Sequence, residues 1–287
     1  MYDNGLIEYY RQLNSREGFL NVKPLKIREL NGPKLLGTTV RCKSPYGYFF
    51  KKFNNWFSKD VADAEILLSQ ISSKLGLNSA IYTPAQEDGK LFLLSNDVWG
   101  DRTVPAEAFH EYISIVEGKP FYKNGNLLNF TAQELSKYFT PNALEQKIKM
   151  QLFDTASNNP DRSITNYFYN INENMQAEDV VLIDHERSGI EANRYYICGK
   201  KSYCASYFTS EFNKHSLSRQ GVIDNVKENE NNILENFDAN KFANELGSIN
   251  VRETALDITR NIGYVVNPDY VDYISSSYNN MAEMLGQ

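Results

Sequence analysis

Short hydrophobic runs separated by polar turns recur in the first hundred residues of the chain and predict a small sheet. Apolar runs bounded by Gly, Pro and Asn turns predict strands over residues 27–30, 34–42 and 47–53, and again over 81–85 and 91–94. Between these two groups, apolar residues recur at helical spacing and predict a helix over residues 59–75. The first third of the chain is therefore expected to be a sheet with one long helix.

The rest of the chain changes to a mainly helical pattern. Apolar residues at helical spacing predict helices over residues 105–115, 131–139, 142–153, 222–235, 239–246, 251–262 and 271–285. Thr131 with Glu134, and Asn250 with Glu253, have the spacing of residues that cap the start of a helix. Two short apolar runs, 166–171 and 180–183, interrupt the helices and predict strands on either side of an acidic hairpin.

Composition narrows the range of functions. The chain has 287 residues, of which 41% are hydrophobic, so it can bury a sizeable core. A net charge of −6 without a long Lys/Arg cluster gives no electrostatic reason to expect a nucleic-acid partner. No apolar run approaches the roughly 18 residues of a membrane span, and the start lacks the pattern of a signal peptide. We therefore expect a cytoplasmic protein.

The cysteines and histidines do not predict a metal centre or a disulfide framework. The three cysteines, Cys42, Cys198 and Cys204, are few and scattered. The three histidines are also far apart in the sequence, so a zinc site is not expected.

One polar turn carries the strongest chemical signal. Residues 158–166 read NNPDRSITN and follow a predicted helix. The second of the two strands predicted after this turn leads into Asp184. Asp161, Asn166 and Asp184 can thereby present oxygen atoms at the ends of two short strands, and oxygen ligands are what magnesium prefers. Phosphoryl transfer requires such a metal set and a carboxylate near the attacking hydroxyl. The alternative is an ordinary turn, because Asn, Pro and Asp also favour turns without any function.

The order of these elements resembles the HipA-like kinases, a family with a protein-kinase-like fold related to the phosphatidylinositol 4-kinases. The family's catalytic segment reads Asn-x-Asp-Arg-His-x-x-x-Asn, followed by a strand that ends in Asp; here it appears as NNPDRSITN and VVLIDHE. The resemblance implies that Asp161 acts on the acceptor hydroxyl and that Asn166 and Asp184 hold magnesium. Ser163 stands where many members carry His, which leaves the subfamily open.

The resemblance also assigns roles in the first part of the chain. In kinases a strand Lys and a helix Glu form an ion pair that positions the α- and β-phosphates of ATP. Lys52 and Glu65 fit this pair, and Lys51 is the alternative lysine because successive strand residues face opposite sides. The other interpretation is that the lysine and the glutamate are ordinary solvated surface residues. The family's hinge implies that Leu94, Ser95 and Asp97 bind adenine. Residues 37–39 and residues 44–47 are both candidates for the phosphate-binding loop, and the sequence does not choose between them because neither has a specific glycine pattern.

The sequence therefore predicts an α+β, two-lobed protein-kinase-like fold. Residues 1–97 would form a small, mostly β N-lobe with one key helix, and residues 98–287 a mostly helical C-lobe. The implied activity is transfer of the γ-phosphoryl group of ATP, with magnesium, to a Ser or Thr hydroxyl of a protein. The alternatives are a kinase of a lipid head group or small molecule, and a pseudokinase that only binds ATP or partners.

A partner protein is also implied by the resemblance. HipA carries an additional N-terminal subdomain, whereas residues 1–26 of this chain can supply only a helix and a connector. We therefore expect that a separate regulatory protein could replace that subdomain.

Overall fold

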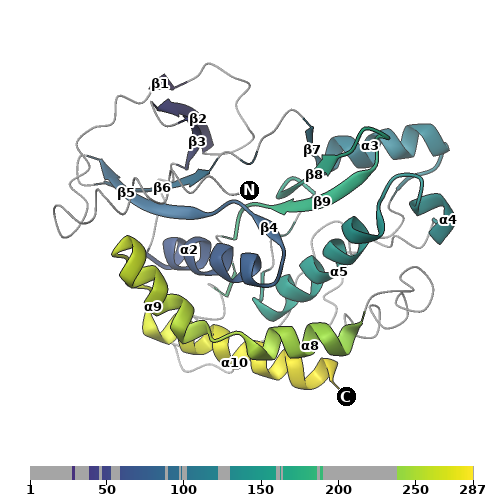
Figure 1. Cartoon of the computed structure of the whole chain (residues 1–287). Helices are drawn as coiled ribbons and strands as arrows, with labels where there is room; N and C mark the ends of the chain where they lie inside the picture. The colour runs from purple at the N-terminus through teal and green to yellow at the C-terminus, as the bar shows by residue number, and fades with distance from the viewer. Residues whose placement is uncertain are drawn as a thin grey trace.

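The computed structural model describes residues 28–29, 39–44, 47–52, 59–87, 90–96, 98, 102–121, 130–159, 162, 164–185, 188–189 and 238–286. The strands form two sheets, and most of the other described residues form helices (Figure 1). One long helix lies between the first sheet and the C-terminal helices. The predicted helix over residues 222–235 and the hairpin after Asp184 lie outside the described residues.

The first sheet has five strands in the order β1-β2-β3-β6-β5. They are β1 (Arg28–Glu29), β2 (Thr39–Ser44), β3 (Gly47–Lys52), β5 (Tyr82–Glu87) and β6 (Lys90–Asn96). All neighbours in this sheet are antiparallel, and β3 lies between β2 and β6. The strands predicted around residues 28, 40, 50, 83 and 93 are therefore confirmed, within a few residues at their ends.

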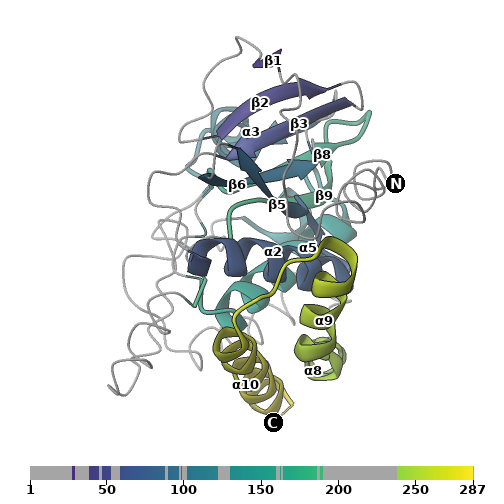
Figure 2. The same ribbon diagram turned by 90° about the vertical axis from the view of Figure 1, so that its left-hand side faces the viewer.

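Helix α2 (Lys59–Lys74) follows the third strand of this sheet and confirms the predicted helix. It ends in a Schellman-type turn, since Gly76 has a φ of +72° and the Leu77 N–H donates to the Ser72 carbonyl at 2.9 Å. The sequence predicted one apolar stripe, but residues 62–69 are all buried. The reason is that α2 packs on β5 on one side and on a C-terminal helix on the other (Figure 2).

The second sheet has the order β4-β9-β8-β7 and combines distant parts of the chain. It contains β4 (Asn78–Ser79), β7 (Thr103–Pro105), β8 (Tyr167–Ile171) and β9 (Ala177–Leu182). Strand β4 pairs in parallel with β9, whereas β7, β8 and β9 are antiparallel. Strands β4 and β7 were not predicted because runs of two and three residues are too short to show alternation.

Two helices, α3 (Ala106–Glu117) and α5 (Pro141–Ala156), pack on this sheet, and the short α4 (Ala132–Leu135) lies between them in the chain. The prediction of one helix over residues 131–139 was wrong. The cap between Thr131 and Glu134 does start a helix, with the Glu134 N–H donating to the Thr131 hydroxyl at 3.2 Å. The helix stops after one turn because Phe139 pairs with Ala177, and this bridge extends the edge of the second sheet.

The C-terminal part consists of α8 (Ala239–Ser248), α9 (Val251–Ile262) and α10 (Pro268–Leu285), which lie together on the side of α2 away from the first sheet (Figures 1 and 2). The predicted starts are confirmed, since the Asn250 side chain accepts from the Glu253 N–H and that of Asn267 accepts from the Asp269 N–H, both at 3.0 Å. Within the described part of the chain, no helix has the length and apolarity needed to cross a membrane.

Candidate active site

The ends of β8 and β9 bring Asn166 and Asp184 to the same edge of the second sheet. Tyr167 is the register partner of Leu182, and the Ile183 N–H donates to the Asn166 carbonyl at 3.1 Å. Asn166 therefore lies opposite Ile183, one residue before Asp184. Both residues are only partly buried, so their side chains are not enclosed by the core. This is the neighbourhood that the sequence predicted for the two metal ligands.

Asp184 has an unusual backbone conformation that its neighbours stabilise. Its φ is +63°, in the left-handed region that costs a residue with a Cβ about 1–2 kcal/mol. The Asp184 N–H lies 3.2 Å from the Tyr82 hydroxyl oxygen, which accepts its hydrogen bond. Residues held in such sparsely populated conformations cluster at active sites. Strand β5, which carries Tyr82, thus contributes to the conformation of the chain at Asp184.

Glu65 reaches the residue that follows Asp184. The Glu65 carboxylate, on α2, accepts a hydrogen bond from the His185 backbone N–H at 2.7 Å. The Glu65 side chain is fully buried, rather than at the margin of the helix as the sequence suggested. The structure therefore brings Glu65 and Asp184 into one site. Lys51 and Lys52 end strand β3, and their side chains are outside the described part of the structure.

Arg162 connects the elements that carry the predicted ligands. Its guanidinium forms two hydrogen bonds to the Asp154 carboxylate on α5, at 2.9 and 3.2 Å. It also donates to the Asn166 carbonyl at 2.7 Å and to the Ile183 carbonyl. The buried guanidinium thus joins the end of α5 to the ends of β8 and β9. Arg162 is the neighbour of Asp161 in the sequence.

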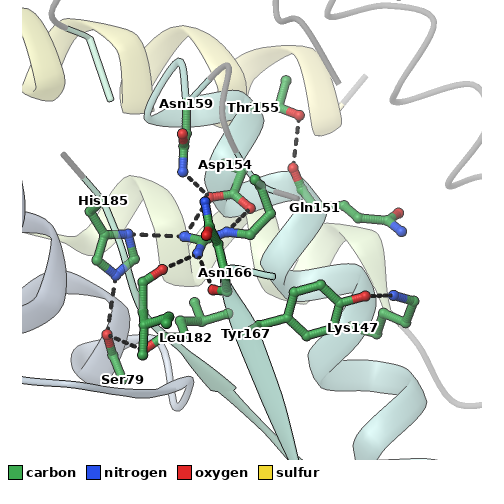
Figure 3. A network of polar contacts seen from close by, with 12 residues as sticks. Ser79, Lys147, Gln151, Asp154, Thr155, Asn159, Asn166, Tyr167, Leu182 and His185 are labelled. Carbon is green, nitrogen blue, oxygen red and sulfur yellow. Dashed lines mark hydrogen bonds and ion pairs between the residues drawn. The ribbon is translucent and has the colours of Figure 1, made fainter. Parts of the chain in front are cut away.

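His185 extends this network to the first half of the chain (Figure 3). Arg162 Nη2 lies 3.1 Å from His185 Nδ1, and His185 Nε2 lies 3.1 Å from the Ser79 hydroxyl. Because a guanidinium can only donate, we assign Nδ1 as the acceptor and place the ring proton on Nε2, which donates to Ser79. Ser79 belongs to β4, so the network runs from Asp154 on α5 to the strand that follows α2.

The charges around Arg162 are mainly negative. Burial lowers the pKa of the Arg162 guanidinium and is the largest single effect, but the charge and the hydrogen bonds of Asp154, together with more distant carboxylates, outweigh it and raise the pKa. The carboxylates of Asp184 and Glu65 raise the pKa of Arg162 further. Burial raises the pKa of the Asp154 carboxyl, and the guanidinium opposes that rise. Among the described residues, three carboxylates thus act on one guanidinium, and this local excess of negative charge favours a bound cation.

Sequence reasoning missed a row of α10 side chains that hold the predicted catalytic turn. The Tyr273 hydroxyl accepts from the Asn158 side chain at 2.9 Å, and the Tyr278 hydroxyl lies 2.8 Å from that of Ser157. The Ser277 hydroxyl donates to the Ala156 carbonyl at 2.6 Å. No local pattern identifies them, because their partners lie more than 100 residues earlier.

Several predicted site residues remain untested by the structure. Asp161, Asp97 and residues 37–38 and 45–46 of the candidate phosphate loops lie outside the described residues. Leu94 and Ser95 are buried in β6 and have register partners in both β3 and β5. The pairing of β6 with β5 ends at Ser95, so fewer backbone groups are hydrogen-bonded within the sheet after this point. Adenine binding at these residues stays a prediction.

The donor set fits magnesium in type. Asn166 and Asp184 offer one amide oxygen and one carboxylate, and magnesium is commonly bound by one or two carboxylates together with substrate phosphates and water. Among the described residues there is no group of three His, Cys, Asp or Glu side chains that could hold a metal alone. Magnesium held by Asn166 and Asp184 would take its other ligands from substrate phosphates and water.

We expect Asp154→Asn to lower the free energy of unfolding by about 3 kcal/mol, because it removes the carboxylate that forms an ion pair with the buried Arg162 guanidinium. Unfolding in urea, followed by far-UV circular dichroism, measures the loss. The matched control is Glu145→Gln, which removes an ion pair to Lys149 on the same helix and should cost less than about 1 kcal/mol. Equal losses in the two variants would show that the buried pair has no special role.

A small sheet with one long helix, a second sheet ending in Asn166 and Asp184, and a helical remainder define the class of this protein. They form an α+β, two-lobed protein-kinase-like fold, as the sequence predicted. A solved structure with this fold is the proinflammatory kinase CtkA of Helicobacter pylori. It is 12% identical to this chain, with a TM-score of 0.54, over 91% of this chain and 95% of CtkA.

Two further solved structures match more weakly. HipA of Shewanella oneidensis, solved in a complex with HipB and operator DNA, is 12% identical, with a TM-score of 0.44 over 97% of this chain and 70% of HipA. A protein of Ralstonia eutropha assigned as an aminoglycoside phosphotransferase is 13% identical, with a TM-score of 0.31. The match covers 99% of this chain and 96% of the Ralstonia protein. No protein-family model matches the chain, and no curated protein matches it.

Proposed function

We propose that this protein is a HipA-like kinase, which transfers the γ-phosphoryl group of ATP to a Ser or Thr hydroxyl of a protein. The observation that supports this most directly is the convergence of three elements. Asn166 comes directly before β8, Asp184 comes shortly after the neighbouring β9, and Glu65 of α2 binds the backbone of the residue after Asp184. In protein kinases the corresponding parts hold the metal and the nucleotide phosphates. The fold shared with CtkA agrees with this proposal but does not define the acceptor.

In this proposal each residue has one role. Asp161 accepts the proton of the acceptor hydroxyl, whose oxygen forms the new bond to the γ-phosphorus while the bond to ADP breaks. Asn166 and Asp184 hold magnesium, which neutralises charge on the phosphates when bound. Arg162 connects the Asp154 carboxylate on α5 to the Asn166 carbonyl and so helps to hold Asn166 in place. Leu94, Ser95 and Asp97 contribute to the adenine site.

Lys52 is the lysine that we propose for the pair with Glu65. The strand register supports this choice over Lys51. Position 52 pairs with Leu93, which belongs to the same hydrophobic core as α2, whereas position 51 pairs with Leu94. Directly paired positions on neighbouring strands lie on one face of the sheet, and successive positions alternate between faces. Position 52 is therefore on the face of the sheet that packs toward α2.

We expect Lys52→Ala to raise the ATP concentration needed for half-maximal transfer by about tenfold or more, because a phosphate contact is lost. Lys51→Ala is the matched control on the opposite face and should be close to wild type. Initial rates over a range of ATP concentrations measure both variants. If Lys51→Ala is the damaging change, the register argument is wrong and Lys51 takes the role. If neither change matters, the assignment of this sheet to phosphate binding fails.

The function itself is tested by incubating the wild-type protein with γ-labelled ATP, magnesium and separate pools of cell protein, lipid and small molecules. Label in protein that acid hydrolysis recovers as phosphoserine or phosphothreonine supports the proposal. Label only in lipid or in small molecules identifies the other kinase class. ATP binding without label in any pool identifies a pseudokinase. A regulatory partner protein, expected from the resemblance, would be sought by adding the protein pool before the assay.

A further inference from the structure

Helix α2 carries a second buried carboxylate, two positions before Glu65, that none of the roles above uses. Asp63 is only 1% exposed. One of its oxygens accepts a hydrogen bond from the Tyr264 hydroxyl at 2.8 Å, and the other accepts from the Asn267 backbone N–H at 3.3 Å. Both donors lie in the connection between α9 and α10. A buried carboxylate with such partners anchors the helix at a defined point, because removing the partners leaves a costly buried charge.

The anchor and the site lie on different sides of the helix. Successive residues of an α-helix are rotated by about 100°, so residues two apart point about 200° away from each other. Asp63 is directed to the α9–α10 connection, and Glu65 is directed to the His185 N–H at 2.7 Å. A rotation of α2 about its axis would therefore break both contacts together. The rotation that places Glu65 in the site is the one that the Asp63 contacts select.

The same C-terminal segment also contacts the chain after Asp184. The Tyr270 hydroxyl donates to the Ser188 carbonyl at 2.9 Å. Gly189 packs so closely that a Cβ there would lie 2.9 Å from the ring of Tyr273. Residues 264–273 thus contact the two parts of the chain that the hydrogen bond between Glu65 and His185 joins. One part is α2, and the other is the segment that follows His185. Residues 264–273 can therefore set the distance between these two parts.

A second contact joins α2 to α9, but at the far end of the helix. The Lys74 ammonium donates to the Thr254 hydroxyl at 2.8 Å and lies 3.9 Å from the Asp257 carboxylate. Lys74 is in the last turn of α2, and its side chain is 46% exposed. Lys74 also joins α2 to the C-terminal helices but is about two and a half turns from Glu65. A change at Lys74 therefore tests for a loss of stability that does not move Glu65.

We propose that Asp63 is a positioning residue: with Tyr264 and Asn267 it fixes the rotation of α2 and so holds Glu65 at the His185 N–H. The catalytic consequence rests on the proposed kinase function, whereas the structural claim does not. The C-terminal connection thereby acts on the nucleotide site from a distance, without touching the substrate itself.

Tyr264→Phe tests this proposal, because it removes only the hydroxyl that donates to Asp63. We expect faster amide hydrogen exchange in two separate segments, the middle of α2 around residues 61–69 and residues 183–186. The control Lys74→Met should speed exchange only in the last turn of α2. Asp63→Asn is a second variant that should reproduce the pattern of Tyr264→Phe. Unchanged exchange in residues 183–186 in both variants would overturn the proposal.

Kinetics separate positioning from general stability. Tyr264→Phe should raise the ATP concentration for half-maximal transfer by about tenfold, with little change in the maximal rate, while Lys74→Met leaves both near wild type. In combination with Glu65→Gln, Tyr264→Phe should add almost nothing, since both changes act through one contact. Full additivity would contradict the proposal. If the wild type transfers no phosphate, the kinase function fails, and the exchange measurements alone decide whether Asp63 positions Glu65.

Discussion

Asp184→Asn is expected to lower phosphoryl transfer by roughly 1,000-fold, which corresponds to about 4 kcal/mol of transition-state stabilisation. Asp184 is the only carboxylate that we assign to the metal, since its proposed partner Asn166 is neutral. An amide at position 184 keeps the size and one oxygen but removes the negative charge that attracts magnesium. The backbone contact to Tyr82 involves the Asp184 N–H and not the side chain, so the fold should survive the change.

The measurement has a part that does not depend on an acceptor. Titration with ATP should show that magnesium strengthens binding to the wild type but not to the Asp184→Asn variant. Glu178→Gln, an exposed carboxylate on the same strand, is the matched control and should retain the effect of magnesium. If Asp184→Asn keeps wild-type turnover and magnesium dependence, Asp184 is not a metal ligand, and the excess of negative charge around Arg162 requires another explanation.

Asp161→Asn is expected to reduce transfer by about 100- to 10,000-fold while leaving ATP binding nearly intact. The asymmetry follows from its proposed role, because Asp161 acts on the acceptor hydroxyl and not on the nucleotide. Stability should also be maintained, since the neighbouring turn is held by the Arg162 bonds to Asp154 and to the Asn166 carbonyl.

The two aspartates can be distinguished by a comparison of binding and turnover. Asp161→Asn should bind ATP with magnesium as the wild type does and fail to label the acceptor. Asp184→Asn should fail in both measurements. A variant of Asp161 that loses ATP affinity as strongly as it loses turnover would place this residue in the metal or nucleotide site, and the assignment of the proton acceptor would then have to change.

The helices were predicted well from the sequence because their signals are local. Helix α9 begins and ends where the apolar spacing and the Asn250 cap indicated, at Val251–Ile262. The helix predicted over residues 131–139 failed for the opposite reason. Its cap was read correctly, but the pairing of Phe139 with Ala177, 38 residues away, decided where the helix stops. Pairing between distant segments leaves no trace in the spacing of residues within one of them.

The candidate site shows the same division. The order of helix, turn and two strands sufficed to select Asn166 and Asp184, and the strand register brings them together. Arg162 was read only as part of a motif, whereas in the structure it joins Asp154, Asn166 and Ile183. Asp63 was passed over entirely. An aspartate on a helix is normally solvated, and this one is buried where α9 and the connection to α10 pack against α2.

The contact between Asp63 and Tyr264 has a consequence for biosynthesis, because its partners are 201 residues apart in the chain. At about 5–20 residues per second, a ribosome makes Tyr264 roughly 10 to 40 s after Asp63. During that interval the Asp63 carboxylate has no C-terminal donor, and its burial in a docked α2 would be unfavourable. Nascent chains that stop before residue 264 are therefore expected to present α2 undocked and to be cleaved there by protease, whereas chains extended past α10 resist cleavage.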